Sequence, residues 1–266
     1  MRLKIYHETR YRFEKPVSYG LQQLRKTPKT NSQQAVVSWQ TTVAGGAKEL
    51  VFDDYHNNVT ELISFDRGTT ELLVSSAGEV EMTDNHGIVG RHRGPAPLWL
   101  YRRETERTRA RAGVRALVKQ AGGAGELDRL HSLLPLITRA VAYETGVSWP
   151  YWTAEDALEE GRGVCQDHAH IFIACARDMG FAARYVSGYL LMDDRIEQEA
   201  MHAWAEAHVD GLGWVGFDVS NGISPDTRYV RVATGLDYSD AAPVSGTRVG
   251  GDAESLDVRI EVQAQQ

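Results

Sequence analysis

The stretch that decides the fold is Gly161-Arg-Gly-Val-Cys-Gln-Asp-His-Ala-His170. Two glycines break the chain here, and the next glycine or proline is Gly180. Because a glycine commonly follows the last residue of a helix, the sequence predicts a helix over residues 164–179. Cys165 then lies in the first turn of this helix, where free backbone N–H groups and the positive end of the helix dipole favour a thiolate.

Cys165 is open to two interpretations. Free cysteines are among the most buried residues, and Cys175, placed between two alanines on the same helix, fits that structural role. The glycines before Cys165 would let a ligand or another backbone approach its sulfur, which favours a reactive cysteine. Ten helical residues separate the two sulfur-bearing positions by ~15 Å, too far for a disulfide. We expect two free thiols, as in a reducing compartment.

Helix and strand signals surround this stretch. Thr153-Ala-Glu-Asp156 is typical of a capped helix start and predicts a short helix ending near Glu160. Leucines between residues 127 and 137 predict an amphipathic helix ending near Tyr143, with Pro135 expected to kink or restart it. Downstream, residues 181–191, 201–209 and 214–219 have the composition of strands, the last two joined by a turn at residues 210–213.

A cysteine nucleophile needs an imidazole nearby and a third group that orients the ring. Among nine histidines, His202 begins the strand 201–209. If His208 lies opposite Trp214 on the next strand, Asp218 becomes the diagonal neighbour of His202 on the same face. A slip of one residue would place Asp218 on the opposite face.

Other residues compete for these roles. His168 and His170 point in different directions from the cysteine helix, and we expect surface or core positions for both. Asp167 and Glu206 are the alternatives to Asp218 as the orienting carboxylate. A zinc site built from Cys165, His202, His208 and Asp218 is a further alternative. The chain lacks the CxxC and HxxxH spacings of common zinc sites, so we expect neither a metal nor another cofactor.

The rest of the chain divides by composition. Residues 1–88 form short apolar runs broken by turn residues, which predicts an antiparallel β domain. Residues 89–125 are expected to be an arginine-rich linker that leads into a polar helix, and residues 241–266 an extension with one strand. Residues 126–240, between them, contain Cys165, His202 and Asp218 and are the expected catalytic core. The predicted fold class is α+β, with a helix carrying the cysteine packed on an antiparallel sheet.

Charge and hydrophobicity exclude several classes of protein. The net charge of −7 argues against a nucleic acid or an anionic membrane as partner. The arginines of residues 91–115 are interrupted by Glu104 and Glu106, and no series of aromatic residues is interleaved with them for base stacking. Residues 1–15 lack the apolar segment of a secretory signal, and no apolar run approaches the ~20 residues that span a bilayer. We therefore expect a cytoplasmic protein.

Four motifs resemble the bacterial transglutaminase-like superfamily, whose members are often described as cysteine proteases. They are residues 161–170, Ala183-Arg-Tyr-Val-Ser-Gly-Tyr-Leu190, His202-Ala-Trp-Ala-Glu206 and Gly213-Trp-Val-Gly-Phe-Asp218. By motif the resemblance covers about residues 126–240. The N-terminal Tyr6-His-Glu-Thr-Arg-Tyr11 and Leu21-Gln-Gln-Leu24, and the C-terminal Asp237-Tyr-Ser-Asp240 and Pro243-Val-Ser-Gly246, are similar to one bacterial subgroup.

The resemblance implies a papain-like core in which Cys165, His202 and Asp218 are catalytic. Two departures concern the substrate cleft. His168 stands where an aromatic residue is usual, and Val219-Ser220 replaces the common Pro-Thr before Asn-Gly.

Residues and resemblance together predict a thiol-dependent enzyme that cleaves amide or isopeptide bonds of a peptide or protein through a thioester. The backbone N–H of Cys165 would bind the oxyanion, with a second donor among Gln166, Trp149 and Trp152. Trp204 is a further candidate for the cleft. We expect water to resolve the thioester. The alternatives are transfer to an amine, as in a transglutaminase, and a peptide-binding scaffold without catalysis. The oligomeric state is left open.

Overall fold

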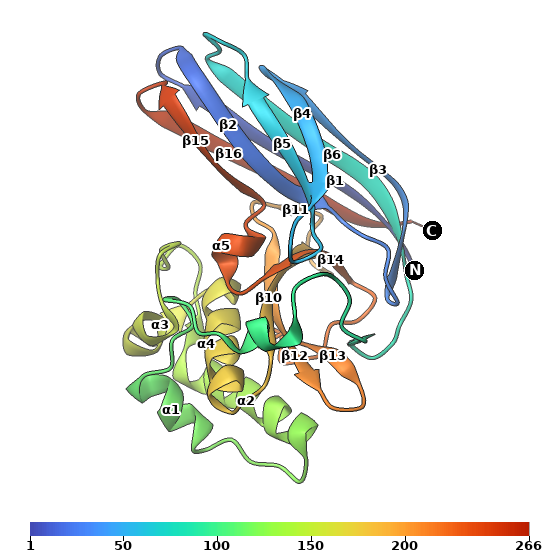
Figure 1. Cartoon of the computed structure of the whole chain (residues 1–266), viewed down its shortest axis with the longest axis vertical. Coiled ribbons are helices and arrows are strands. Elements are labelled where there is room, and N and C mark those ends of the chain that lie inside the picture. Colours follow the sequence, from blue (N-terminus) through green and yellow to red (C-terminus); the bar gives the residue numbers. More distant parts are fainter. Residues whose placement is uncertain (266) are drawn as a thin grey trace.

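Strands from both ends of the chain build a β sandwich in the computed structural model, which describes residues 1–265 (Figure 1). In β1 every second residue is fully buried, as expected of a strand with one face on a core. One sheet has the order β11-β16-β1-β6-β3 and the other the order β15-β2-β5-β4. The strands are β1 (Arg2–Phe13), β2 (Val17–Thr27), β3 (Gln34–Ala44), β4 (Gly46–Asp53), β5 (Val59–Phe65), β6 (Glu71–Met82), β11 (Glu197–Gln198), β15 (Val244–Gly250) and β16 (Glu254–Gln265).

The inner face of the first sheet contributes side chains to two hydrophobic cores. Tyr11 and Phe13 of β1 pack with Leu24 and Ile63 of the second sheet. The other end of the same strand, around Ile5, packs into the large core of the remaining α+β part of the chain. The sandwich is therefore joined to that part by a shared apolar layer.

The C-terminal extension differs from the expected single strand. It forms two strands, β15 along β2 and β16 along β1, so that it completes both sheets of the sandwich. Most residues of β15 are exposed or half-buried, and those of β16 before Ile260 are similar. β16 nevertheless alternates regularly, with apolar residues at positions 256, 258, 260, 262 and 264. β15 has no such alternation, so its sequence carries no comparable strand signal.

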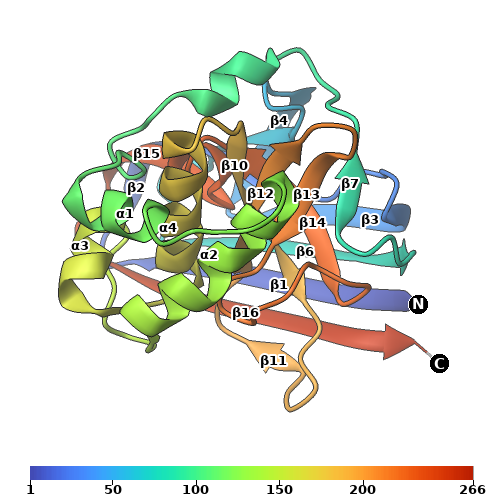
Figure 2. The same ribbon diagram turned by 90° about the horizontal axis from the view of Figure 1, so that it is seen from below.

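The α+β part is built on a third antiparallel sheet with helices on one side (Figure 2). Its strand order is β14-β10-β12-β13-β7. The strands are β7 (Ile88–Gly90), β10 (Ala183–Leu190), β12 (His202–Val209), β13 (Gly213–Phe217) and β14 (Tyr229–Gly235), with a separate parallel pair β8 (Ala142–Tyr143) and β9 (Arg162–Gly163). The helices are η1 (Leu98–Arg102), α1 (Ala112–Val118), α2 (Glu126–Ala140), α3 (Ala154–Glu160), α4 (Cys165–Asp178) and α5 (Tyr238–Ala241).

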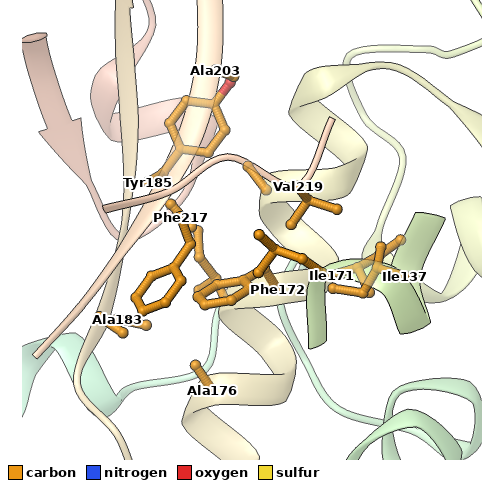
Figure 3. Close-up of a cluster of buried hydrophobic side chains, with 14 of the residues drawn as sticks. Ile137, Ile171, Phe172, Ala176, Ala183, Tyr185, Ala203, Phe217 and Val219 are labelled. Carbon is orange, nitrogen blue, oxygen red and sulfur yellow. The ribbon is translucent and has the colours of Figure 1, made fainter. Parts of the chain in front are cut away.

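Helix α4 is the centre of this part. Every residue from Asp167 to Arg177 is buried, because the sheet lies on one side and other helices lie on the rest. Phe172 stacks on Phe217 of β13 with ring centroids 4.8 Å apart (Figure 3). This packing fixes the start of α4 relative to β12 and β13.

The helix predictions differ from the structure in two details. Helix α2 continues through Pro135 and ends at Ala140 rather than near Tyr143. Leucines on both sides of the proline are buried, and this packing offsets the missing hydrogen bond. The arginine-rich segment forms η1 and α1, and α1 buries Val114 and Leu117. No helix within residues 1–265 is long and apolar enough to cross a bilayer.

Candidate active site

Cys165 is the first residue of α4 and is half-buried. The helix start is held by Asp167, whose Oδ2 accepts a hydrogen bond from the Val164 backbone N–H at 2.8 Å. Gly163 makes room for this cap, because a Cβ there would lie 2.8 Å from the same oxygen. Gly161 ends α3 with a φ of 68°. The two glycines thus shape the turn and the helix cap that precede Cys165.

His202 and Asp218 come together through strand register. β12 pairs with β13 so that His208 lies opposite Trp214, as expected. Asp218 directly follows β13, and its Oδ2 accepts a hydrogen bond from His202 Nε2–H at 2.7 Å. Both side chains are buried. The bond fixes the tautomer of the ring and leaves Nδ1 free to exchange a proton.

The pKa values couple His202 to Cys165 as well. Burial alone would lower the pKa of His202, but the hydrogen bond with Asp218, the neighbouring Cys165 side chain and the charges of both raise it to about 10. Burial would likewise raise the pKa of Asp218, but the hydrogen bond and charge of His202 lower it. The structure therefore brings Cys165, His202 and Asp218 together in that order.

Two residues that the sequence did not single out complete the surroundings of Asp218. Its Oδ2 also accepts hydrogen bonds from Asn221 Nδ2 and from the Tyr229 hydroxyl, each at 2.7 Å. Asn221 belongs to the Asn-Gly turn just after Asp218, which was a usable signal. Tyr229 begins β14 after a loop and had no signal of its own.

The candidate cleft residues occupy different positions. Trp204 is buried and stacks on His202, with ring centroids 6.2 Å apart, so it supports the imidazole from behind. Trp149 is 58% exposed and stacks on Tyr151. Trp152 packs against the core, and Gln166 is half-buried beside Cys165.

Tyr143 on β8 is an aromatic neighbour that the sequence reasoning missed. Burial, followed by the negative charge of Cys165, raises the pKa of Tyr143. The side chain is nevertheless 53% exposed, so it combines proximity to Cys165 with access to solvent. β8 pairs with β9 so that Tyr143 lies opposite Gly163, two residues before Cys165, and this places Tyr143 beside the start of α4.

The two departures from the family pattern contact each other. His168 Nδ1 accepts a hydrogen bond from Ser220 Oγ at 2.9 Å, and its Nε2–H donates to the Val141 carbonyl at 3.0 Å. Burial lowers the pKa of His168. The pair connects the cysteine helix to the loop after Asp218 and is a structural contact.

The remaining polar candidates have structural surroundings. Glu206 is fully buried between Arg184 and Arg231, at 2.5 and 2.9 Å. His170 is fully buried and accepts a hydrogen bond from the Tyr238 backbone N–H. In the described part of the chain, no three His, Cys, Asp or Glu side chains are grouped as metal ligands would be.

Comparisons with known proteins find likenesses along nearly the whole chain. A protein named "Putative Cysteine Protease" from Cytophaga hutchinsonii has a crystal structure that covers 99% of this chain and 90% of its own, with 20% identity and a TM-score of 0.78. That likeness shows the fold. An uncharacterized protein of Mycobacterium leprae is 28% identical over 276 residues, covering 98% of each chain. An uncharacterized protein of Mycobacterium tuberculosis is 35% identical over 147 residues, which are 51% of this chain and 47% of that protein.

Two family models match the chain. Residues 3–81 match the bacterial transglutaminase-like N-terminal region. Residues 115–219, which include Cys165, His202 and Asp218, match the transglutaminase-like superfamily. These matches support a thiol-dependent enzyme in general terms. With a core of that superfamily behind its bacterial N-terminal region, the chain belongs to the transglutaminase-like superfamily.

Proposed function

We propose that the protein hydrolyses amide or isopeptide bonds of a peptide or protein substrate, with Cys165 as the nucleophile. The observation that carries the proposal is the position of His202. One of its ring nitrogens forms a hydrogen bond with Asp218, and the ring also lies close to Cys165. Nucleophile, base and orienting carboxylate in that order form the arrangement that acyl transfer requires.

The first half of the reaction forms a thioester. The Cys165 thiolate attacks the carbonyl carbon, a C–S bond forms, and the oxygen takes the negative charge. The backbone N–H of Cys165 at the free start of α4 is positioned to stabilise that oxyanion. The His202 imidazolium then gives its Nδ1 proton to the amine, the C–N bond breaks, and the amine leaves.

The second half regenerates the thiolate. Neutral His202 accepts a proton from water as the water attacks the thioester carbonyl. The C–S bond breaks and the acid product leaves. Asp218 stays ionised throughout and holds the ring in one orientation, because its pKa is lowered by the imidazole it contacts.

An amine in place of water would give the transglutaminase reaction from the same thioester. Hydrolysis is preferred because water is always present at high concentration. The family resemblance keeps amine transfer as the second candidate.

A peptide-library digestion followed by mass spectrometry tests the proposal. The full chain is expected to generate cleavage products or glutamine-to-glutamate conversion, and Cys165→Ala to generate none. Cys175→Ala is the matched control and should retain the activity, because Cys175 is fully buried away from solvent. A parallel reaction with a fluorescent primary amine decides between water and amine as the acceptor.

Contrary results would be informative. Products that persist in Cys165→Ala would exclude the cysteine mechanism. Fluorescent adducts in place of hydrolysis products would identify an acyltransferase. Binding of library peptides without any turnover by the unmodified chain would support a scaffold.

A further inference from the structure

β14 is an edge strand of the catalytic sheet, and two side chains of the N-terminal region cover its open edge. Gln34 Nε2–H donates to the Arg231 carbonyl and Gln34 Oε1 accepts from the Arg231 N–H, both at 2.8 Å. Asn58 forms the same pair of bonds with the Thr234 carbonyl and N–H, again at 2.8 Å. A primary amide carries one donor group and one acceptor, so each side chain replaces a neighbouring strand at one residue.

A β-bulge makes this double contact geometrically available. β14 pairs with β10 through Ala233 opposite Ser187 and Arg231 opposite Gly188, so Val232 is an extra residue. In a regular strand, residues three apart direct their backbone groups to opposite edges. Because of the extra residue, the backbone N–H and C=O groups of Arg231 and Thr234 point to the same edge of the sheet. Gln34 and Asn58 can therefore reach both from one side.

The strand held in this way enters the candidate active site. Tyr229, the first residue of β14, donates its hydroxyl proton to Asp218 Oδ2 at 2.7 Å. It lies only two residues from Arg231. Gln34, Asn58 and Tyr229 are all buried, and Figure 1 shows β14 at the junction of the sandwich with the rest of the chain.

The segment after β14 has a third contact with the N-terminal region, this time between two side chains. His56 Nε2 forms a hydrogen bond with Asp240 Oδ2 at 3.0 Å, and the same oxygen accepts the Leu236 backbone N–H at 2.9 Å. The N-terminal region thus contacts residues 231, 234 and 240 along one continuous stretch.

We propose that Gln34 and Asn58 are positioning residues for the active site, acting through Tyr229 on Asp218. This inference rests on the proposed catalytic role of Cys165, His202 and Asp218. The N-terminal region is then part of the catalytic machinery, because its two amides fix the strand that supplies a donor to the orienting carboxylate.

Alkylation by iodoacetamide tests the inference without knowledge of the substrate. The rate of Cys165 modification is measured against pH by mass spectrometry in the full chain. Tyr229→Phe removes one donor to Asp218 and leaves the ring. Without this donor, Asp218 and the His202 ring are held less firmly beside Cys165, so the thiolate is less stabilised. The acid limb of the profile then moves to higher pH, and the rate near neutral pH falls about tenfold.

The amide variants should reproduce this change in smaller form. Gln34→Ala and Asn58→Ala are expected to lower the rate about threefold each and to move the acid limb in the same direction. In the Tyr229→Phe background they should have no further effect, because their influence passes through the missing hydroxyl.

Ser76→Ala is the matched control. Ser76 is buried in the sandwich and forms a hydrogen bond with Thr41 at 3.0 Å, so the variant loses a comparable bond away from β14. Thermal unfolding is measured for every variant. The control should lose stability with an unchanged pH profile.

The outcomes separate this inference from the proposed function. If Cys165 in the unmodified chain reacts no faster than Cys175, the proposed function fails. If Cys165 is reactive but the amide variants leave the acid limb in place, or add fully to Tyr229→Phe, the positioning role is overturned. If Asn58→Ala does not fold, the comparison of Gln34→Ala with the double variant Gln34→Ala/Tyr229→Phe still tests the positioning role.

Discussion

The start and the middle of α4 carry the same residue type in opposite surroundings. Cys165 is half-buried at the helix start, beside an imidazole that is itself bound to a carboxylate. Cys175 is fully buried ten residues later, its Sγ 3.9 Å from the Val114 carbonyl, and burial raises the pKa of its thiol. Position on the helix, and not the helix itself, therefore decides which sulfur can act as a nucleophile.

The polar groups differ in the same way. At the start of α4, the His202 ring is held by the Asp218 carboxylate and can exchange a proton at its other nitrogen. Further along, Arg177 is buried and donates to three backbone carbonyls and to Thr108 Oγ1. The start of the helix therefore has a half-buried thiol beside titratable groups. The later part has a permanently charged guanidinium that connects surrounding segments through their carbonyl groups.

The largest expected effect comes from exchanging the two cysteines for alanine. Cys165→Ala should lower turnover of a peptide substrate to the uncatalysed rate, because the covalent path is lost. His202→Ala should do nearly the same, since the two residues act as a unit and their losses do not add. Cys175→Ala should keep kcat. A comparable loss of kcat in both cysteine variants would remove the distinction between the two positions.

The next effect concerns the orienting carboxylate. Asp218→Asn keeps a hydrogen-bonding group but favours the wrong imidazole tautomer, and we expect kcat to fall on the order of 10²–10³. Steady-state kinetics with Glu206→Gln and Asp167→Asn as controls checks the assignment. If either control removed activity while Asp218→Asn did not, the orienting residue would be a different one.

The middle of α4 should respond in stability and not in chemistry. Arg177→Met leaves several buried carbonyl oxygens without a donor, and we expect the free energy of unfolding to fall by about 3 kcal/mol. Urea unfolding with an unchanged m-value measures the loss. Arg115→Met is the control, since this arginine is exposed and should change stability by about 0.5 kcal/mol or less. An equal loss in both variants would contradict the structural role of Arg177.

The smallest effect is a pH dependence. His202 has a usual pKa of 6.5 and a folded pKa of about 10, so the folded state binds its proton more tightly. Its contribution to stability is present in full below pH 6.5 and is lost as the pH rises to about 10.

The Cys165→Ala background isolates this term from titration of the thiol. The stability difference between Cys165→Ala and Cys165→Ala/His202→Gln should decline by about 1.4 kcal/mol for each unit by which Asp218 still raises the pKa. Denaturant unfolding at several pH values measures it. A difference that grew with pH would show that His202 is neutral in the folded protein.

Local signals in the sequence predicted most of the catalytic half. The turn at residues 210–213 sets the register of β12 with β13, and the alternation along β12 then places His202 near Asp218. Gly161 and Gly163 before the helix of Cys165, and Gly180 after it, indicated where that helix begins and ends. These features depend on residues close together in the chain, which is why sequence alone could locate them.

Long-range contacts were not predictable in this way. Tyr229 reaches Asp218 across a loop, and its position depends on Gln34 and Asn58, far away in the sequence. β15 lacks apolar alternation and is identified only by its partner β2. β16 does alternate, but its partner β1 lies at the opposite end of the chain, so the pairing could not be predicted. The roles of the cleft tryptophans could not be predicted either, because residue type alone does not decide whether a tryptophan is buried, as Trp204 is, or exposed, as Trp149 is.

The pairing of β1 with β16 has a consequence for how the chain is made. β1 can pair with β6 early, but its other edge stays open until residues 254–265 leave the ribosome. An open strand edge of this length is a template for aggregation in a growing chain. Folding of the inserted catalytic part shortens the effective loop and reduces the entropic cost of bringing the two strands together. Early folding of the α+β part is therefore expected to favour closure of the sandwich into which it is inserted.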